Sequence, residues 1–428
     1  MAKKGGIRWT IYLVVTLSIV LSLLAGCSGS SAPAAKESGK PAEKTEAQQP
    51  AKSEAQQPAK SEAPKAASSK EPYKVAWVGS LTGAFGAVGS AIKKGVDLEV
   101  DTVNKAGGID GHPIELIVYD DQSKAEDVVQ LFKKAVEQDK VLAILGPLPS
   151  VQVIPTQPIA RTLNTPWLFF GSVMPTADDK YMFSVINTVD QLVETYIAYI
   201  SKQGWKRVVG LHPTDDLSNR ASAAMKNIAP KYGVEIVGEE RYGLKDTDIV
   251  PQVTKLKALN PQAIIAWGTG DPAVLAYRNA RQVGLDAPMF LNTSAASSNF
   301  FNLTGDIPKK GLLYTGGVRA MYADQLPASD PAKDKAKAFR TAFMAKYNDP
   351  PGANEAWGFD SAEMVFDAIK KVGPDRAKIK DYLSDMKFDG VGGTYIRKAS
   401  DVASHVGMDP SSFIIITAEG KKWVKADQ

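Results

Sequence analysis

The 428-residue chain contains one cysteine, so no disulfide can form within the molecule and the fold depends on its hydrophobic core. It has only three histidines, His112, His212 and His405, and none stands at a metal-ligand spacing from another. A GxSxG sequence, which would mark a serine nucleophile, is absent as well. We therefore expect no enzyme activity, no bound metal and no cofactor.

Concentrated positive charge is also absent. The formal net charge is +4, and lysines alternate with acidic residues along the chain. Nucleic acids bind to clustered basic residues, so a nucleic-acid partner is not expected. Gly83, Gly86 and Gly89 invite comparison with a dinucleotide-binding loop, but their GxxGxxG spacing differs from the GxGxxG spacing of that loop. Nucleotide binding is therefore not expected either.

The pair Asp120-Asp121 ends a predicted strand and could in principle bind a cation. Aspartates at such positions more often accept hydrogen bonds from the backbone N–H groups of the turn and helix that follow. We expect this second, structural role for both residues.

An apolar run, residues 11–24, lies near the N-terminus and is too short for a comfortable bilayer span of about 20 residues. Three basic residues precede it, and Leu24-Ala25-Gly26-Cys27 closes it. The arrangement resembles a bacterial lipoprotein signal. This resemblance implies removal of residues 1–26, a diacylglycerol on Cys27, and an extracytoplasmic protein anchored to the cell membrane. An ordinary cleaved signal and an uncleaved anchor are the alternatives.

Residues 27–72 contain almost no large apolar side chain. The eight residues Glu46–Ser53 are repeated unchanged as Glu54–Ser61. Such a segment cannot bury enough surface to offset the entropy of ordering, so we expect a disordered tether. A flexible coil of this length has an end-to-end distance of roughly 40 Å. The tether would hold a folded domain away from a membrane but close to it.

From Tyr73 onward, short apolar runs alternate with segments whose apolar residues recur at helical spacing. The alternation predicts strands at 75–79, 114–119, 141–145, 167–171, 208–211, 234–237 and 264–268, and helices at 92–106, 125–136, 193–202, 221–232, 249–259 and 274–283. Continuous apolar strands between amphipathic helices are typical of parallel sheets, and about 350 residues exceed the limit of roughly 250–300 for one core. We predict an α/β fold with two doubly wound parallel sheets, one in each of two lobes.

Glycines and polar residues follow the predicted strands at their carboxyl ends, where open parallel sheets bind ligands. The segments are 82–89 with Phe85, 146–150 with Leu148, and Gly171-Ser172 in the first half, and 212–219, 268–271 with Gly270, and 292–294 in the second half. Two such sets of loops that face each other would form a cleft.

Six short motifs occur in order along residues 73–428. They are Gly79-Ser80-Leu81-Thr82-Gly83, Asn104-Lys105-Ala106-Gly107-Gly108-Ile109-Asp110-Gly111, Asp120-Asp121-Gln122-Ser123, Gly146-Pro147-Leu148-Pro149-Ser150, Ala280-Arg281-Gln282-Val283-Gly284-Leu285 and Phe388-Asp389-Gly390-Val391-Gly392-Gly393. In order and spacing they resemble the substrate-binding proteins of the branched-chain amino acid class, which have the type I periplasmic binding protein fold and supply an ABC transporter.

The resemblance implies that the chain crosses three times between the lobes. Lobe one would comprise residues 73–188 and 318–395, and lobe two would comprise residues 189–317 and 396–428. The three crossing strands would act as a hinge. A ligand that contacts both lobes would favour their closed arrangement.

The resemblance also implies a carboxylate site. In the amino acid binders of this family, a serine hydroxyl and backbone N–H groups hold the ligand carboxylate, and Ser150 and Gly171 match these positions. A threonine of the family is replaced by Val173, although Ser172 beside it could substitute. A tyrosine of the second lobe is replaced by Leu217.

The acid that pairs with a ligand ammonium in this family falls at Thr293-Ser294, where no carboxylate stands. Because an unpaired buried ammonium is costly, an amino acid ligand would need another acid, for which Asp271 and Asp215 are the candidates. An aromatic or aliphatic carboxylate would need none, and both ligand classes stay open. Phe85, Leu148 and Gly270 complete the expected ligand-binding set.

The resemblance implies a monomeric binding protein that delivers a small carboxylate-bearing solute to an ABC permease. A ligand-sensing subunit of the same fold, which signals to a receptor or regulator, is the alternative.

Overall fold

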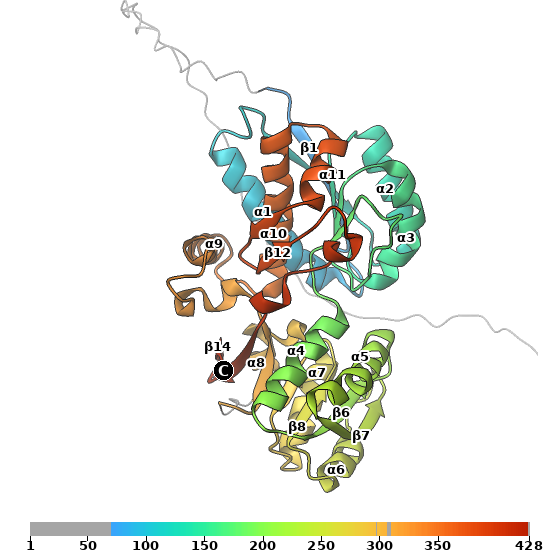
Figure 1. Ribbon diagram of the computed structural model, residues 1–428, viewed down its shortest axis with the longest axis vertical. Helices are drawn as coiled ribbons and strands as arrows, with labels where there is room; N and C mark the ends of the chain where they lie inside the picture. Colours follow the sequence, from blue (N-terminus) through green and yellow to red (C-terminus); the bar gives the residue numbers. More distant parts are fainter. Residues whose placement is uncertain (1–69, 297, 306–309, 427–428) are drawn as a thin grey trace, which may run out of the picture. The chain divides into compact units, whose positions relative to one another are not determined.

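The computed structural model describes residues 70–296, 298–305 and 310–426 (Figure 1). The predicted signal, Cys27 and the tether up to residue 69 lie outside the described residues. Among the described residues, no helix has both the length and the apolar character that a membrane span requires.

The first sheet has five parallel strands in the order β2-β1-β3-β4-β5. They are β1 (Tyr73–Gly79), β2 (Ile114–Asp120), β3 (Ile144–Leu145), β4 (Trp167–Phe169) and β5 (Met182–Ser184). The helices α1 (Gly86–Lys105), α2 (Ala125–Lys133) and α3 (Ser150–Leu163) connect successive strands. The order reverses between β1 and β3, so the crevice typical of such folds lies at the carboxyl ends of these two strands.

The second sheet has seven strands in the order β14-β13-β10-β9-β8-β6-β7. Its parallel part comprises β6 (Arg207–Pro213), β7 (Glu235–Tyr242), β8 (Ala263–Ala266), β9 (Met289–Leu291) and β10 (Leu313–Gly317). The helices α4 (Val189–Lys202), α5 (Asp216–Ile228), α6 (Val250–Ala258), α7 (Asp271–Gln282) and α8 (Ser298–Thr304) accompany these strands.

The prediction of an α/β fold with two sheets is confirmed, but the second sheet is not entirely parallel. Strand β13 (Ile414–Glu419) runs antiparallel to β10, and β14 (Lys422–Lys425) runs antiparallel to β13. Only a short turn joins β13 to β14, and a connection of this length cannot link parallel neighbours.

The chain passes more than once between the first sheet with its helices and the second sheet with its helices. After β10 it forms α9 (Lys333–Tyr347), α10 (Ala353–Val372), α11 (Arg376–Ser384) and the hairpin β11 (Lys387–Asp389) and β12 (Thr394–Ile396), before it returns to the second sheet as β13. Of these elements, α10 packs along α1 beside the first sheet. The two lobe boundaries given above stay a prediction.

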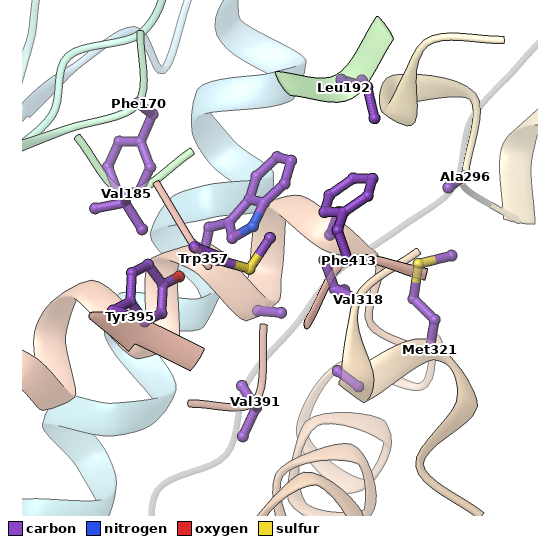
Figure 2. Packing of buried hydrophobic residues seen from close by; sticks show 14 of the residues in the cluster. Phe170, Val185, Leu192, Ala296, Val318, Met321, Trp357, Val391, Tyr395 and Phe413 are labelled. Atoms are coloured by element: carbon purple, nitrogen blue, oxygen red, sulfur yellow. The ribbon is translucent and has the colours of Figure 1, made fainter. Parts of the chain in front are cut away.

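A single hydrophobic cluster includes side chains from the surroundings of both sheets (Figure 2). Its labelled members are Phe170, Val185, Leu192, Ala296, Val318, Met321, Trp357, Val391, Tyr395 and Phe413. Each is at most 9% exposed. Burial of one large apolar side chain stabilises a fold by about 1.5–3 kcal/mol, so this cluster stabilises the segments that pass between the two sheets.

Polar contacts fix the turn between β11 and β12 within this cluster. The Asp360 carboxylate accepts hydrogen bonds from the N–H groups of Val391 (2.7 Å) and Gly392 (2.8 Å). From the other side, the Arg319 guanidinium donates to the carbonyl oxygen of Gly390 and to the hydroxyl of Thr394. A buried carboxylate with several donors is tolerated because its lone pairs are satisfied.

Close packing of α1 against α10 buries another acid. A Cβ atom on Gly95 would lie 1.9 Å from the carbonyl oxygen of Glu355, and one on Gly358 would lie 1.9 Å from that of Ile92, so only glycine permits this helix contact. On the same face of α1, Glu99 is 7% exposed. Burial raises its pKa from 4.5 to about 8, repulsion from Glu363 adds to the shift, and Lys335 opposes it.

The raised pKa of Glu99 gives a testable pH dependence. Between pH 4.5 and about pH 8 the folded protein holds a proton on Glu99 that the unfolded chain releases, so the free energy of unfolding falls as the pH rises through this range. Glu99→Gln removes this loss. We expect the variant to be more stable than the wild type at pH 8, by about 1 kcal/mol or more, and equally stable at pH 4.5. Urea unfolding at the two pH values measures the difference.

The exposed Glu115 supplies the control, since Glu115→Gln should leave the pH dependence unchanged. If Glu99→Gln shows the same loss of stability between pH 4.5 and pH 8 as the wild type, then Glu99 does not hold a proton in the folded protein.

Candidate functional site

The crevice residues Ser150 and Gly171 come together although they are far apart in the sequence. Ser150 is the first residue of α3, which follows β3, and Gly171 follows β4. A Cβ atom on Gly171 would lie 3.3 Å from the Cα of Ser150 and 2.8 Å from a methyl group of Val153. A larger residue than glycine would therefore push the two segments apart.

Ser150 and Gly171 each carry a hydrogen-bond donor that the described residues do not use. Within the described residues, neither the hydroxyl of Ser150 nor the N–H of Gly171 makes a hydrogen bond. The first N–H groups of a helix such as α3 also lack intrahelical partners, and they attract negative charge. A serine hydroxyl, a free glycine N–H and a helix N-terminus together suit a carboxylate.

A cavity of about 370 Å³ lies beside this pair. Its lining residues come from α3, the segment after β4, the start of α4, and α5: Ile154, Ser172, Val173, Met174, Thr188, Val189, Asp190, Arg220 and Ala223. Ile154 stands one helical turn after Ser150 on α3, so the two side chains share a face of the helix. The cavity therefore borders the segments that carry Ser150 and Gly171, although neither of these two residues is among those that line it.

Ser172 ties the cavity wall to two helices of the second half of the chain. Its hydroxyl accepts a hydrogen bond from the N–H of Val189 (3.1 Å). Its carbonyl oxygen accepts one from Nη1 of Arg220 (3.0 Å). The Ser172 hydroxyl is thus engaged with the start of α4, while the buried Val173 beside it adds apolar surface to the lining.

The candidate acid Asp215 acts as the N-cap of α5. Its carboxylate accepts hydrogen bonds from the N–H (2.8 Å) and from the hydroxyl (3.0 Å) of Ser218. Leu217, two residues further along, is half-buried and packs against the large hydrophobic cluster. Neither residue lines the cavity.

The remaining candidates of the second half also lie outside the cavity lining. Gly270 precedes α7 with a φ of +66°, and Asp271 is the exposed first residue of that helix. Thr293 and Ser294 form a short turn after β9, in which the side chain of Asn292 accepts a hydrogen bond from the N–H of Ser294 (3.0 Å).

The two other candidates of the first half have structural partners. Phe85 is half-buried, and its N–H donates to the hydroxyl of Ser123 (3.0 Å). Leu148 is half-buried and packs against the large hydrophobic cluster. Both belong to segments that follow strands of the first sheet, on either side of the point where its strand order reverses.

The aspartates after β2 hold turns, as expected. The Asp120 carboxylate accepts from the N–H groups of Leu81 (2.9 Å) and Gln122 (2.9 Å), and the Asp121 carboxylate accepts from the N–H of Ser123 (2.8 Å). The expected helix cap is wrong, however. The N-cap of α2 is Lys124, whose side chain makes no capping bond, because both carboxylates are already engaged by the turns.

Two charged lining residues, Asp190 and Arg220, were not among the sequence-based candidates. Asp190 lies in the first turn of α4 and Arg220 lies on α5, three residues after Leu217. Both are exposed polar residues of amphipathic helices, so the hydrophobic pattern does not distinguish them from ordinary surface residues. The i, i+3 relation of Arg220 to Leu217 is the one signal that could have indicated it.

The chemistry of the lining suits binding. Apolar side chains, two hydroxyls, one carboxylate and one guanidinium surround the cavity. Within the described part of the chain, no cluster of three or more His, Cys, Asp or Glu side chains could hold a metal ion. The site offers hydrogen-bond donors to an anion and apolar contacts to the rest of a small molecule.

Comparisons with known proteins indicate one family. Residues 72–411 match the family model described as periplasmic binding protein. The Leucine-, isoleucine-, valine-, threonine-, and alanine-binding protein of Pseudomonas aeruginosa is 25% identical over 323 residues, which cover 74% of this chain and 83% of the relative. The Leu/Ile/Val-binding protein of Escherichia coli is 24% identical over 327 residues, which cover 76% of this chain and 86% of the relative.

Solved structures give the same picture. The branched-chain amino acid transporter substrate binding protein LivJ from Streptococcus pneumoniae, in complex with isoleucine, has a TM-score of 0.68 and 25% identity, with 83% of this chain and 100% of that chain covered. An extracellular ligand-binding receptor from Rhodopseudomonas palustris HaA2 has a TM-score of 0.72 and 22% identity, with 83% and 100% covered.

The free donors of Ser150 lead to a mutational prediction. Ser150→Ala removes one hydroxyl from a charged oxygen of a bound carboxylate, and we expect the dissociation constant to rise about tenfold or more. Isothermal titration with the tightest-binding carboxylate of a small panel measures the change. The exposed Ser329 gives a matched control, since Ser329→Ala should bind as the wild type does. An unchanged affinity in Ser150→Ala would remove this residue from the site.

Proposed function

Because this chain belongs to the periplasmic binding protein family, whose model matches residues 72–411, we propose that it captures a small carboxylate-bearing solute outside the cytoplasm and delivers it to an ABC permease. Members of this family bind solutes and are not enzymes, so no chemical step is assigned. The protein acts as a monomer that holds the ligand between its two lobes.

The observation that supports this function best is the contact between Ser150 and Gly171 beside the cavity. The two residues supply a hydroxyl and an N–H that have no hydrogen-bond partner among the described residues, at the N-terminus of α3, and the neighbouring lining is largely apolar. Charge-assisted hydrogen bonds to a carboxylate are worth about 1.5–3 kcal/mol each. The apolar lining would take the remainder of the ligand.

Two classes of ligand are proposed, one from the names of the relatives and one from the residues of the site. The names of similar proteins specify leucine, isoleucine, valine and other amino acids, so an amino acid with an apolar side chain is the first candidate. Neither Thr293 nor Ser294 is an acid that could pair with an ammonium group. Aromatic and aliphatic carboxylates, which lack this group, should therefore be tested together with the amino acid. Both classes share the carboxylate that the site would bind.

Membrane attachment would come from the N-terminal segment. Leu24-Ala25-Gly26-Cys27 supports lipidation of Cys27, and residues 28–72 would form the tether between the lipid and the folded part. Attachment near the membrane would keep the loaded protein close to its permease. One acyl anchor alone binds a membrane weakly, whereas two or more chains on one residue give stable attachment.

A ligand screen tests the binding function. A ligand at a hundredfold excess over its dissociation constant stabilises the folded protein by about 2.7 kcal/mol, which raises the melting temperature measurably. We expect at least one compound among apolar amino acids, aromatic acids and short fatty acids to do so. A melting temperature that no member of the panel raises would contradict carboxylate capture.

Lipidation is tested separately. Cys27→Ser removes the thiol that would carry the lipid, so we expect the variant to leave the membrane fraction and to lose incorporation of a labelled fatty acid, while ligand binding stays unchanged. Cell fractionation with fatty-acid labelling measures both. Equal labelling of the variant and the wild type would exclude Cys27 as the site of attachment.

A further inference from the structure

Arg220 is the one cationic side chain among the described residues that line the cavity. It stands on α5, beside the second sheet, and its Nη1 donates to the carbonyl oxygen of Ser172 at 3.0 Å. Ser172 directly follows Gly171, and Gly171 lies against Ser150. The guanidinium therefore contacts the residue that follows Gly171, one of the two residues whose donors suit a carboxylate.

Most of the hydrogen-bonding capacity of Arg220 is unused. A guanidinium has five N–H donors in a planar fork, and the contact with Ser172 engages one of them. Within residues 70–296, 298–305 and 310–426, no ion pair joins Arg220 to a carboxylate. The edge formed by Nε and Nη2 thus has the shape and charge for a bidentate carboxylate.

We propose that Arg220 is the cationic half of a carboxylate clamp, in which Ser150 and Gly171 hold the ligand from the side of the first sheet and Arg220 holds it from the side of the second. The inference rests on the proposed function and assigns the site a specificity residue. A carboxylate bound by both halves stabilises their closed arrangement, because it makes its full set of hydrogen bonds only there. Arg220 thereby links recognition of the negative charge to closure.

The second charged lining residue restricts the ligand further. Asp190 lines the same cavity from α4, and its carboxylate repels an anionic group that comes close to it. A ligand with two acidic groups would place one of them near Asp190. The clamp therefore selects monocarboxylates whose other end is apolar or positively charged.

The test compares carboxylates with their amides. Isoleucine, phenylacetate and hexanoate, each beside its carboxamide, are titrated into the full-length protein and into Arg220→Gln, which removes the charge, shortens the side chain and keeps an amide donor. We expect Arg220→Gln to weaken binding of a carboxylate by about tenfold to a hundredfold and to change carboxamide binding less than twofold. Arg220→Lys should recover part of the affinity, since it restores the charge without the planar fork.

Arg278→Gln is the matched control, because Arg278 is an exposed residue of α7 outside the cavity lining, and it should bind as the wild type does. If the wild type binds a carboxylate and Arg220→Gln binds it equally well, or loses carboxylate and carboxamide to the same extent, the clamp is overturned while the proposed function stands. If the wild type binds none of the three carboxylates, the proposed function fails and the clamp fails with it.

Discussion

The close approach of Gly171 to Ser150 is the constraint on which the rest of the site depends. A Cβ atom on Gly171 would lie 3.3 Å from the Cα of Ser150 and 2.8 Å from a methyl group of Val153, so glycine at this position allows the end of β4 to lie close against the start of α3. This contact brings the two residues together at the N-terminus of a helix.

The surrounding fold keeps this geometry in place and leaves the cavity open. The large hydrophobic cluster stabilises the crossing segments, and the Asp360 carboxylate with the Arg319 guanidinium holds the turn between β11 and β12. By contrast, the cavity wall includes the exposed apolar side chains of Ile154 and Met174. Apolar side chains left in water beside a packed core are suited to contact with a ligand.

Much of the fold could be predicted from the sequence because buried parallel strands give continuous apolar runs. The strand predicted at 114–119 is observed as β2, and the one predicted at 208–211 lies within β6. The direction of β13 could not be predicted, since an apolar run has the same pattern in a parallel and an antiparallel strand. The short connection determines only that β14 runs antiparallel to β13.

The site was predictable where backbone geometry determines it and less so where exposed side chains do. Ser150 and Gly171 follow apolar strands, so their position at the sheet edge could be inferred, and the structure places them in contact. Asp215 was a candidate partner for an ammonium, yet its carboxylate caps α5, and sequence alone does not separate these two uses of an aspartate. Apart from its i, i+3 relation to Leu217, Arg220 gave no signal in the sequence, because an arginine on the polar face of a helix is common.

A crystal structure of the protein with a bound carboxylate ligand tests the central claim most directly. The account predicts a ligand carboxylate oxygen within about 2.7–3.2 Å of both the Ser150 hydroxyl and the Gly171 nitrogen, with the apolar part of the ligand in the neighbouring cavity. A ligand that binds elsewhere, or a cavity that is filled by the protein's own side chains in the loaded state, would contradict it.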